Sequence, residues 1–329
     1  MYYGLVWIAA LPRRASPPLE LTRMASIGQR LALIAIAAGA LLAASCGDGG
    51  PPPEEVSPYF PVTVARADGK ELTFERPAQR IVSLSPGHTE VLFAIGAGDQ
   101  VIAEDSEANF PPETEGKTRF DAQSPDVEAL EGLEPDLVVV MAGPEEVVKS
   151  LDQRGLQVLW LAVPDSVSGL LDQIDMLGEI TGRVEESDAL VDSIDSRFIS
   201  VFDTVGATAG PRVYHELDDE LTTTSSSTFI GELYLILNGI SIADDPEEPY
   251  PQLALDAIVQ ADPEVIIVAH AGASPESVKA RPGWQNISAV KNDRVYAVDP
   301  DTVNRPGPRL VDGLETLAKL LHPDLFPEP

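Results

Sequence analysis

The chain has 329 residues, of which 44% are hydrophobic, enough for the cores of two domains of ordinary size. It carries 22 Lys and Arg against 53 Asp and Glu, a formal net charge of −31. Such a surface repels nucleic acid and anionic lipid, so nucleic acid is not expected as a partner. The chain has one cysteine, Cys46, which excludes an internal disulfide.

Residues 1–46 have the pattern of a secretory leader. Arg30 precedes an apolar run from Leu31 to Ala44, which is too short to span a membrane comfortably. Cys46 follows small residues, as in a bacterial lipobox, whose cysteine takes a lipid. Ala43 stands where leucine is usual, so an ordinary signal peptide cleaved nearby stays open. Met24 begins a compact signal and is the expected true start.

The next stretch, residues 47–58, is rich in Gly, Pro and Glu and predicts a disordered tether. The tether would hold the folded part off the membrane. We therefore expect an extracytoplasmic protein on the outer (periplasmic) face of the cytoplasmic membrane. Its lipid anchor would be its sole membrane contact.

Residues 59–183 predict a first α/β lobe. Asp68-Gly69 lies between two short strands and indicates a hairpin. Ser85-Pro86 is typical of a helix start, with a stop at Gly96. Strands are predicted at 80–84, 101–103, 137–140 and 158–161, and further helices at 144–154 and 167–180. This alternation favours a mostly parallel sheet.

A helix is predicted from Val184 to Val205, and it joins the two halves of the chain. Its apolar residues recur at steps of three, four and seven, which places them on one helical face. They are Val184, Val191, Ile194, Phe198, Phe202 and Val205.

Residues 206–329 predict a second α/β lobe. Strands are expected at 212–215, 240–242 and 294–298, and helices at 229–237 and 310–321. Residues 255–268 also match residues 127–140 of the first lobe, without a gap. Acid aligns with acid, Pro135 with Pro263, and one aliphatic run with another. Each copy predicts a short helix, a turn and a buried strand, although such units look alike in many α/β proteins.

Ligands of open α/β sheets bind outside the carboxyl ends of the strands. Two lobes joined by one helix would place those ends on facing walls of a cleft. The candidate wall residues are His88, Phe110, Phe120 and Met141 in the first lobe, and His215, Glu216, Tyr250 and His270 in the second.

The histidines leave several interpretations open. His88 could cap an anionic ligand or ligate the metal of a chelate, or simply be a solvent-exposed cap residue. His88, His215 and His270 have the chemistry of a zinc-type site, but their spacing matches no motif, and no metal site is predicted. The sequence has no Gly-x-Ser-x-Gly elbow and no P-loop, so no catalysis is expected.

Several motifs together carry a family resemblance. They are Arg80-Ile-Val-Ser-Leu-Ser-Pro-Gly-His-Thr-Glu90, Gly96-Ala-Gly98, Phe110-Pro-Pro112, Glu134-Pro-Asp-Leu-Val138 and the helix at 184–205. With them, the chain from Pro61 to Pro323 resembles the iron-chelate and cobalamin class of periplasmic substrate-binding proteins. That resemblance implies two Rossmann-like lobes with mostly parallel sheets, joined by one long rigid helix. It also implies a monomer that serves the permease dimer of an ABC importer and its ATPase.

Within that class, Tyr250-Pro-Gln-Leu-Ala-Leu-Asp256 resembles the cobalamin-binding branch, which has Trp-Pro-Gln there. Phe120 and Met141 match two further pocket aromatics of that branch. Phe120, Met141 and Tyr250 are therefore expected ligand contacts, and His88 and Glu216 join them as candidate wall residues that follow strands.

The resemblance also assigns two docking residues. Glu128 and Asp256 occupy equivalent positions of the repeat and match the glutamates with which the class docks on its permease. The alternative role for both acids is to complement a helix dipole.

The resemblance implies capture of cobalamin or a related cobalt- or iron-containing chelate, with no resident cofactor. A siderophore or haem receptor, a bare-metal receptor and a secreted hydrolase are the alternatives. An anionic siderophore would need basic residues in the cleft, and Arg119 and Arg305 form no cluster in the sequence. A hydrolase would need an activated nucleophile, which no motif supplies.

Overall fold

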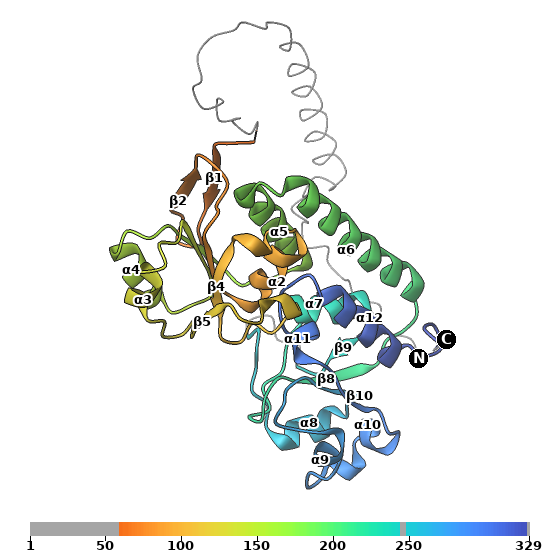
Figure 1. The fold of residues 1–329 in the computed structure, drawn as a ribbon. Helices are drawn as coiled ribbons and strands as arrows, with labels where there is room; N and C mark the ends of the chain where they lie inside the picture. The colour runs from red at the N-terminus through yellow and green to blue at the C-terminus, as the bar shows by residue number, and fades with distance from the viewer. Residues whose placement is uncertain (1–58, 244–247, 328–329) are drawn as a thin grey trace, which may run out of the picture. The chain divides into compact units, whose positions relative to one another are not determined.

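The computed structural model describes residues 59–243 and 248–327 (Figure 1). The predicted leader, its lipidation residue Cys46 and the tether at 47–58 lie outside these residues. Among the residues described, none of the helices combines the length and the apolar character needed to cross a membrane.

The predicted hairpin is confirmed. Strands β1 (Val62–Ala65) and β2 (Glu71–Phe74) pair antiparallel, and Gly69 at the turn has φ 79°. That backbone conformation favours glycine, which has no Cβ to clash with the preceding carbonyl.

The first parallel sheet has the order β5-β4-β3-β6-β7 among the described residues. Its strands are β3 (Ile81–Leu84), β4 (Val101–Asp105), β5 (Thr118–Phe120), β6 (Leu137–Met141) and β7 (Val158–Leu161). The helices of this lobe are α2 (Pro86–Ala94), α3 (Val127–Glu131), α4 (Glu145–Gln153) and α5 (Val167–Thr181). Alternate residues of β6 pack against α2 and α5 on one face and against α3 and α4 on the other, so the strand is buried on both sides.

Two short strand segments differ from the sequence prediction. Strand β4 continues to Asp105, two residues past its predicted end, and β5 was not predicted. Glu104 and Asp105 are polar but buried, and β5 has only three residues, so neither segment has a hydrophobic pattern that would indicate a strand.

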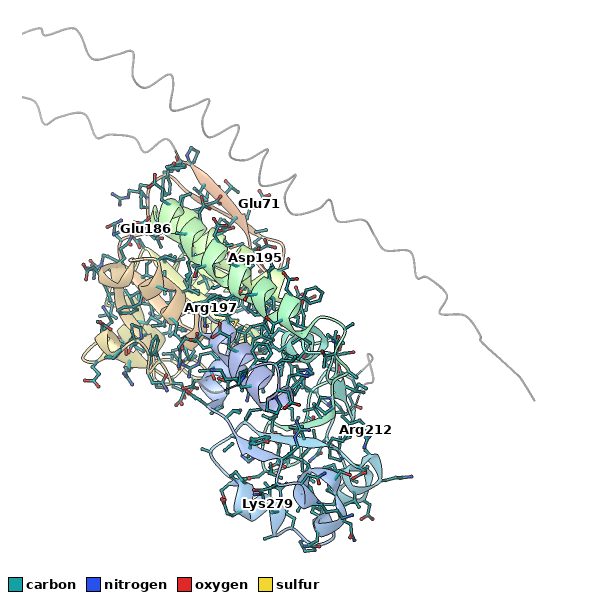
Figure 2. All side chains as sticks on the ribbon, turned by 90° about the vertical axis from the view of Figure 1, so that its right-hand side faces the viewer. Glu71, Glu186, Asp195, Arg197, Arg212 and Lys279 are labelled. Atoms are coloured by element: carbon teal, nitrogen blue, oxygen red, sulfur yellow. The ribbon has the colours of Figure 1, made fainter. Side chains whose placement is uncertain are left out.

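Helix α6 spans Val184–Val205, the predicted range. The prediction that Phe202 is buried is wrong, because its side chain is 57% exposed and Val201 is buried instead. Steps of three and four from Phe198 lead to Val201 and Val205, which keeps the buried face continuous. Figure 2 shows Glu186, Asp195 and Arg197 in order along α6.

The second parallel sheet has the order β11-β10-β8-β9 among the described residues. Its strands are β8 (Arg212–Glu216), β9 (Ile240–Ser241), β10 (Val265–Val268) and β11 (Val295–Ala297). The longer helices are α7 (Phe229–Ile236), α8 (Leu255–Ala261) and α12 (Leu310–Leu321), and the shorter ones are α9 (Pro275–Lys279), α10 (Ser288–Lys291) and α11 (Pro300–Val303). Helices α7 and α12 share one hydrophobic cluster with this sheet, and α8, α9 and α10 share another.

The sequence repeat extends to side-chain contacts. Glu134 and Asp262, the equivalent residues before proline, both have positive φ, 50° and 46°. Arg80 Nε donates to the Glu134 carbonyl at 3.0 Å, and Arg212 Nε donates to the Asp262 carbonyl at 3.1 Å. Two residues further along the chain, the carboxylates of Asp136 and Glu264 accept from the backbone N–H groups of the same two arginines. This shared arginine clamp supports an internal repeat over a chance likeness.

One hydrophobic cluster runs through both halves of the described chain. It contains Ile81 and Leu92 from the first lobe, Phe198 from α6, and Leu233 and Leu314 from the second lobe. The described residues accordingly belong to one compact unit. Relative motion of two lobes is disfavoured when they share a large hydrophobic interface.

Candidate functional site

A pocket of about 510 Å³ opens at the carboxyl end of the first sheet. Leu84, Asp105 and Met141 contribute the last residues of β3, β4 and β6, and Asp121 follows β5. The full lining is Leu84, Ser85, Pro86, Asp105, Ser106, Glu107, Asp121, Ala122, Gln123 and Met141. This is the position at which open α/β sheets bind ligands.

The buried carboxylate of Asp105 builds one wall of the pocket. Its Oδ1 accepts from the Glu107 N–H at 2.7 Å and its Oδ2 from the Ala122 N–H at 3.1 Å. These bonds tie the loop after β4 to the loop after β5. Burial raises the pKa of Asp105, although the two N–H groups oppose that shift.

Asp121 and Glu107 present exposed carboxylates along the same wall. The Ser124 hydroxyl donates to Asp121 at 2.8 Å and the Gln123 N–H donates at 2.9 Å. These hydrogen bonds lower the pKa of Asp121, so it is ionised at neutral pH.

Sequence reasoning missed the polar part of this wall. The rule that ligand residues follow strands would have found Asp105, Glu107 and Asp121, had β4 been extended and β5 recognised. The available signal was the run of polar residues after Ala103, the residue at which the predicted strand ended.

Of the aromatic and thioether contacts predicted from the sequence, Met141 lines the pocket. Phe120 is only 9% exposed and packs in the core beneath the sheet with Val82 and Leu84. Tyr250 lies in the second lobe and is 44% exposed. Its loop is held on both sides, because the carbonyls of the flanking prolines accept from the N–H groups of Ser225 and Thr223, each at 2.9 Å.

His88 is 1% exposed, which contradicts the alternative of a solvent-exposed cap residue. Its Nε2 lies 3.0 Å from the Gln173 Oε1. Burial lowers the pKa of His88 to about 4, so the imidazole is neutral near pH 7. His88 does not line the pocket described above.

Glu216 is fully buried at the end of β8 and already paired. Arg281 donates to both of its oxygens, and His270 Nε2 lies 3.0 Å from its Oε1. His215 is held separately between the Tyr234 hydroxyl and Asn304. The three candidate histidines thus have three different sets of partners. Within residues 59–243 and 248–327, no group of three or more His, Cys, Asp or Glu is placed to hold a metal ion.

A buried ion-pair cluster fixes α2, whose first residue Pro86 lines the pocket, to the second lobe. The Glu90 carboxylate accepts from Arg305 Nη1 at 2.8 Å and from Arg309 Nε and Nη2 at 2.8 and 2.7 Å. Gly87 packs so closely that a Cβ there would lie 2.2 Å from the Pro306 carbonyl oxygen. Arg305, a candidate cleft cation in the sequence, is therefore already neutralised by carboxylates.

Glu128 and Asp256 are exposed, each the second residue of its helix, α3 or α8. Asp126 already caps α3, since its side chain accepts from the Ala129 N–H at 3.0 Å. The N-cap residue of α8, Ala254, makes no side-chain hydrogen bond.

A family model described as periplasmic binding protein matches residues 81–302. The chain therefore belongs to the periplasmic binding protein family. It is 32% identical over 307 residues to the uncharacterized ABC transporter substrate-binding lipoprotein YvrC of Bacillus subtilis, a match covering 89% of this chain and 97% of that protein.

Solved structures agree with this assignment. The periplasmic vitamin B12 binding protein BtuF of Vibrio cholerae superposes with a TM-score of 0.66 at 25% identity, covering 77% of this chain and 99% of that one. A periplasmic haem-binding protein from Pseudomonas aeruginosa superposes with a TM-score of 0.68 at 21% identity, covering 75% and 93%, and shares the fold. The predicted fold class, two mostly parallel α/β lobes joined by one long helix, is confirmed.

The family and the fold define what the chain does in general terms. It is the extracytoplasmic substrate-binding protein of an ABC transporter, with a small-molecule ligand and a permease partner. The predicted absence of catalysis is confirmed by the family, whose members bind and deliver a ligand.

Proposed function

We propose that the protein captures cobalamin or a related cobalt- or iron-containing chelate at the pocket of the first lobe and delivers it to an ABC permease. The observation that carries this proposal is the 510 Å³ pocket at the ends of β3, β4 and β6, in a chain similar to a vitamin B12 binding protein. Leu84, Pro86 and Met141 supply the apolar surface on which a flat macrocycle would rest.

Haem remains the second candidate, because a haem-binding protein has the same fold. A siderophore is less well supported, since Arg119 and Arg305 are each paired with buried carboxylates, Glu104 and Glu90. A bare-metal site has no cluster of ligands in the described chain to support it.

The anchor and the docking contact belong to the same proposal. Lipidation of Cys46 is supported by the lipoprotein YvrC, to which the chain is similar. Glu128 and Asp256 are proposed to meet basic residues on the two halves of the permease, because the repeat places both at one position of equivalent, exposed helices. The receptor itself is proposed to be a monomer.

The ligand is tested by titrating the soluble chain, from Gly47 onward, with cobalamin, cobinamide, haem and ferric chelates. Tryptophan fluorescence and calorimetry would report binding. Saturable binding of one chelate supports the proposal, and the absence of binding by all four would contradict it.

Two contacts can be tested with the ligand so identified. Met141→Ala and Tyr250→Ala should each weaken binding by about 1–3 kcal/mol if these side chains cover the ligand. Phe120→Ala should chiefly lower the melting temperature, because Phe120 is a core residue. Unchanged affinity in both the Met141 and Tyr250 variants would place the ligand elsewhere.

A further inference from the structure

The charged residues of the pocket lining are all acidic. Its lining includes the carboxylates of Asp105, Glu107 and Asp121 and contains no lysine, arginine or histidine. The other polar lining residues are Ser85, Ser106 and Gln123, which carry no charge. A bound molecule would therefore meet negative charge and hydrogen-bond acceptors along this wall.

The acceptors differ in their availability. Both oxygens of Asp105 already accept from backbone N–H groups, so Asp105 shapes the wall. Asp121 and Glu107 are exposed, and the hydrogen bonds to Asp121 keep its pKa low and its charge in place. These two carboxylates are the groups that a ligand would contact.

Arginines that touch the same loops do not offset this charge. Arg119 donates to the Ser106 carbonyl, and its Nη2 lies 3.2 Å from a buried Glu104 oxygen. Arg305 reaches the Glu107 carbonyl at 3.5 Å, but it is paired with Glu90 and Asp301. Each positive charge is already matched by a carboxylate of the protein, so a ligand carboxylate would have to displace one of these pairs.

We propose that the pocket selects neutral or cationic chelates whose periphery donates hydrogen bonds, and rejects chelates that carry free carboxylates. This inference rests on the proposed function, which makes the pocket the ligand site. An amide or ammonium N–H forms a charge-assisted hydrogen bond with Asp121 or Glu107. A ligand carboxylate in the same place meets like charge across a partly desolvated wall, which penalises binding.

The charge of the whole chain acts in the same direction. The formal net charge of −31 produces a negative field that speeds the arrival of cationic ligands and slows that of anions. Salt screens such a field, so the association of a cationic chelate should slow as salt is raised.

The test compares two probes by calorimetry at pH 7. Aquacobinamide is a cationic, amide-rich cobalt chelate, and haem carries two free carboxylates. We expect aquacobinamide to bind wild type at least about tenfold more tightly than haem, the effect of about one charge-assisted hydrogen bond. Raising the NaCl concentration should weaken aquacobinamide binding.

The variant Glu107→Gln/Asp121→Asn removes both charges and keeps the side-chain shapes. It should weaken aquacobinamide binding about tenfold and tighten haem binding, because the like charges that oppose the haem carboxylates are gone. The control Glu113→Gln/Glu115→Gln removes two exposed charges of the same lobe that do not line the pocket, and should change neither affinity. Equal melting temperatures of the variants and wild type would show that folding is intact.

The outcomes separate this inference from the proposed function. Wild-type protein that binds haem as tightly as aquacobinamide overturns the selectivity and leaves a chelate receptor. Identical affinities in the pocket variant and the control also overturn the selectivity. Failure of wild type to bind any chelate overturns the proposed function and the inference together.

Discussion

Buried histidines are the residues whose protonation most directly opposes folding. His88 and His215 are both buried, and burial lowers the pKa of each from 6.5 to about 4. Hydrogen bonds to Gln173 and Asn304 oppose that shift but do not cancel it. The folded state therefore holds both rings neutral in a pH range in which the unfolded chain protonates them.

The sign of the resulting pH dependence follows from proton binding. Between about pH 6.5 and 4 the unfolded state binds more protons at these histidines, so the free energy of unfolding should decrease as the pH falls. Each histidine contributes at most about 3 kcal/mol over this range. Glu104 and Asp105, whose pKa values burial raises, act in the opposite direction. Urea titrations at several pH values give the free energy of unfolding as a function of pH. Between about pH 6.5 and 4, its slope against pH should be shallower in His215→Gln than in wild type. Equal slopes would mean that His215 does not contribute.

At the scale of elements, α6 joins the lobes and two further contacts reinforce it. Arg197 on α6 donates to Glu315 and Asp312 of α12, and its Nε lies 2.8 Å from Glu315 Oε1. The Glu90 cluster joins α2 to the segment around Arg305 and Arg309. A continuous helix also resists bending, because bending breaks its hydrogen-bond ladder.

These contacts predict that the lobes move little when a ligand binds. Small-angle scattering profiles of the free and the chelate-bound protein should nearly coincide, and a domain closure of tens of degrees would contradict the prediction. The variant Glu90→Gln should lower the free energy of unfolding by about 3–5 kcal/mol, because Arg305 and Arg309 lose the buried carboxylate that they share at the lobe contact. The exposed residue Glu113, changed to Gln, is the control and should have little effect.

For the whole molecule, pseudo-symmetry is the property that matters for the permease. The arginine clamps of Arg80 and Arg212 hold equivalent turns in the two lobes, and each turn follows a helix with an exposed acid in its first turn. A receptor with matched charges on both lobes can dock across a two-fold partner.

The docking role can be separated from ligand binding. In Glu128→Gln/Asp256→Asn, chelate affinity and melting temperature should stay near wild type, while ligand-stimulated ATPase activity and uptake by the reconstituted transporter should fall. Asp256 is shorter than glutamate, so its contact is expected to be the weaker of the two. The matched control, Glu113→Gln/Glu276→Gln, also removes one exposed charge from each lobe and should transport normally. Full transport by the docking variant would leave the two acids as helix-dipole partners.

Local patterns were sufficient to predict most of the elements. The steps of three and four along 184–205 predicted α6 with its observed ends, and Asp68-Gly69 predicted the hairpin, because both signals depend on near neighbours in the chain. The ordered motifs and the helix at 184–205 indicated the family, which the comparisons confirmed. The rule for strand ends also predicted the edge of the sheet at which the pocket lies.

The tertiary structure decided which polar residues face a ligand and which are already paired. In the sequence, Glu216 and Arg305 were candidates for contact with a ligand. In the structure, each is paired with an oppositely charged residue, 65 and 215 residues away along the chain. Asp105 and Asp121 were missed, because β4 ends in polar residues, β5 has only three residues, and only the pairing of these strands in the sheet brings the two carboxylates together. Side-chain pairing over such separations depends on how the whole chain packs, and spacing along the sequence does not encode it.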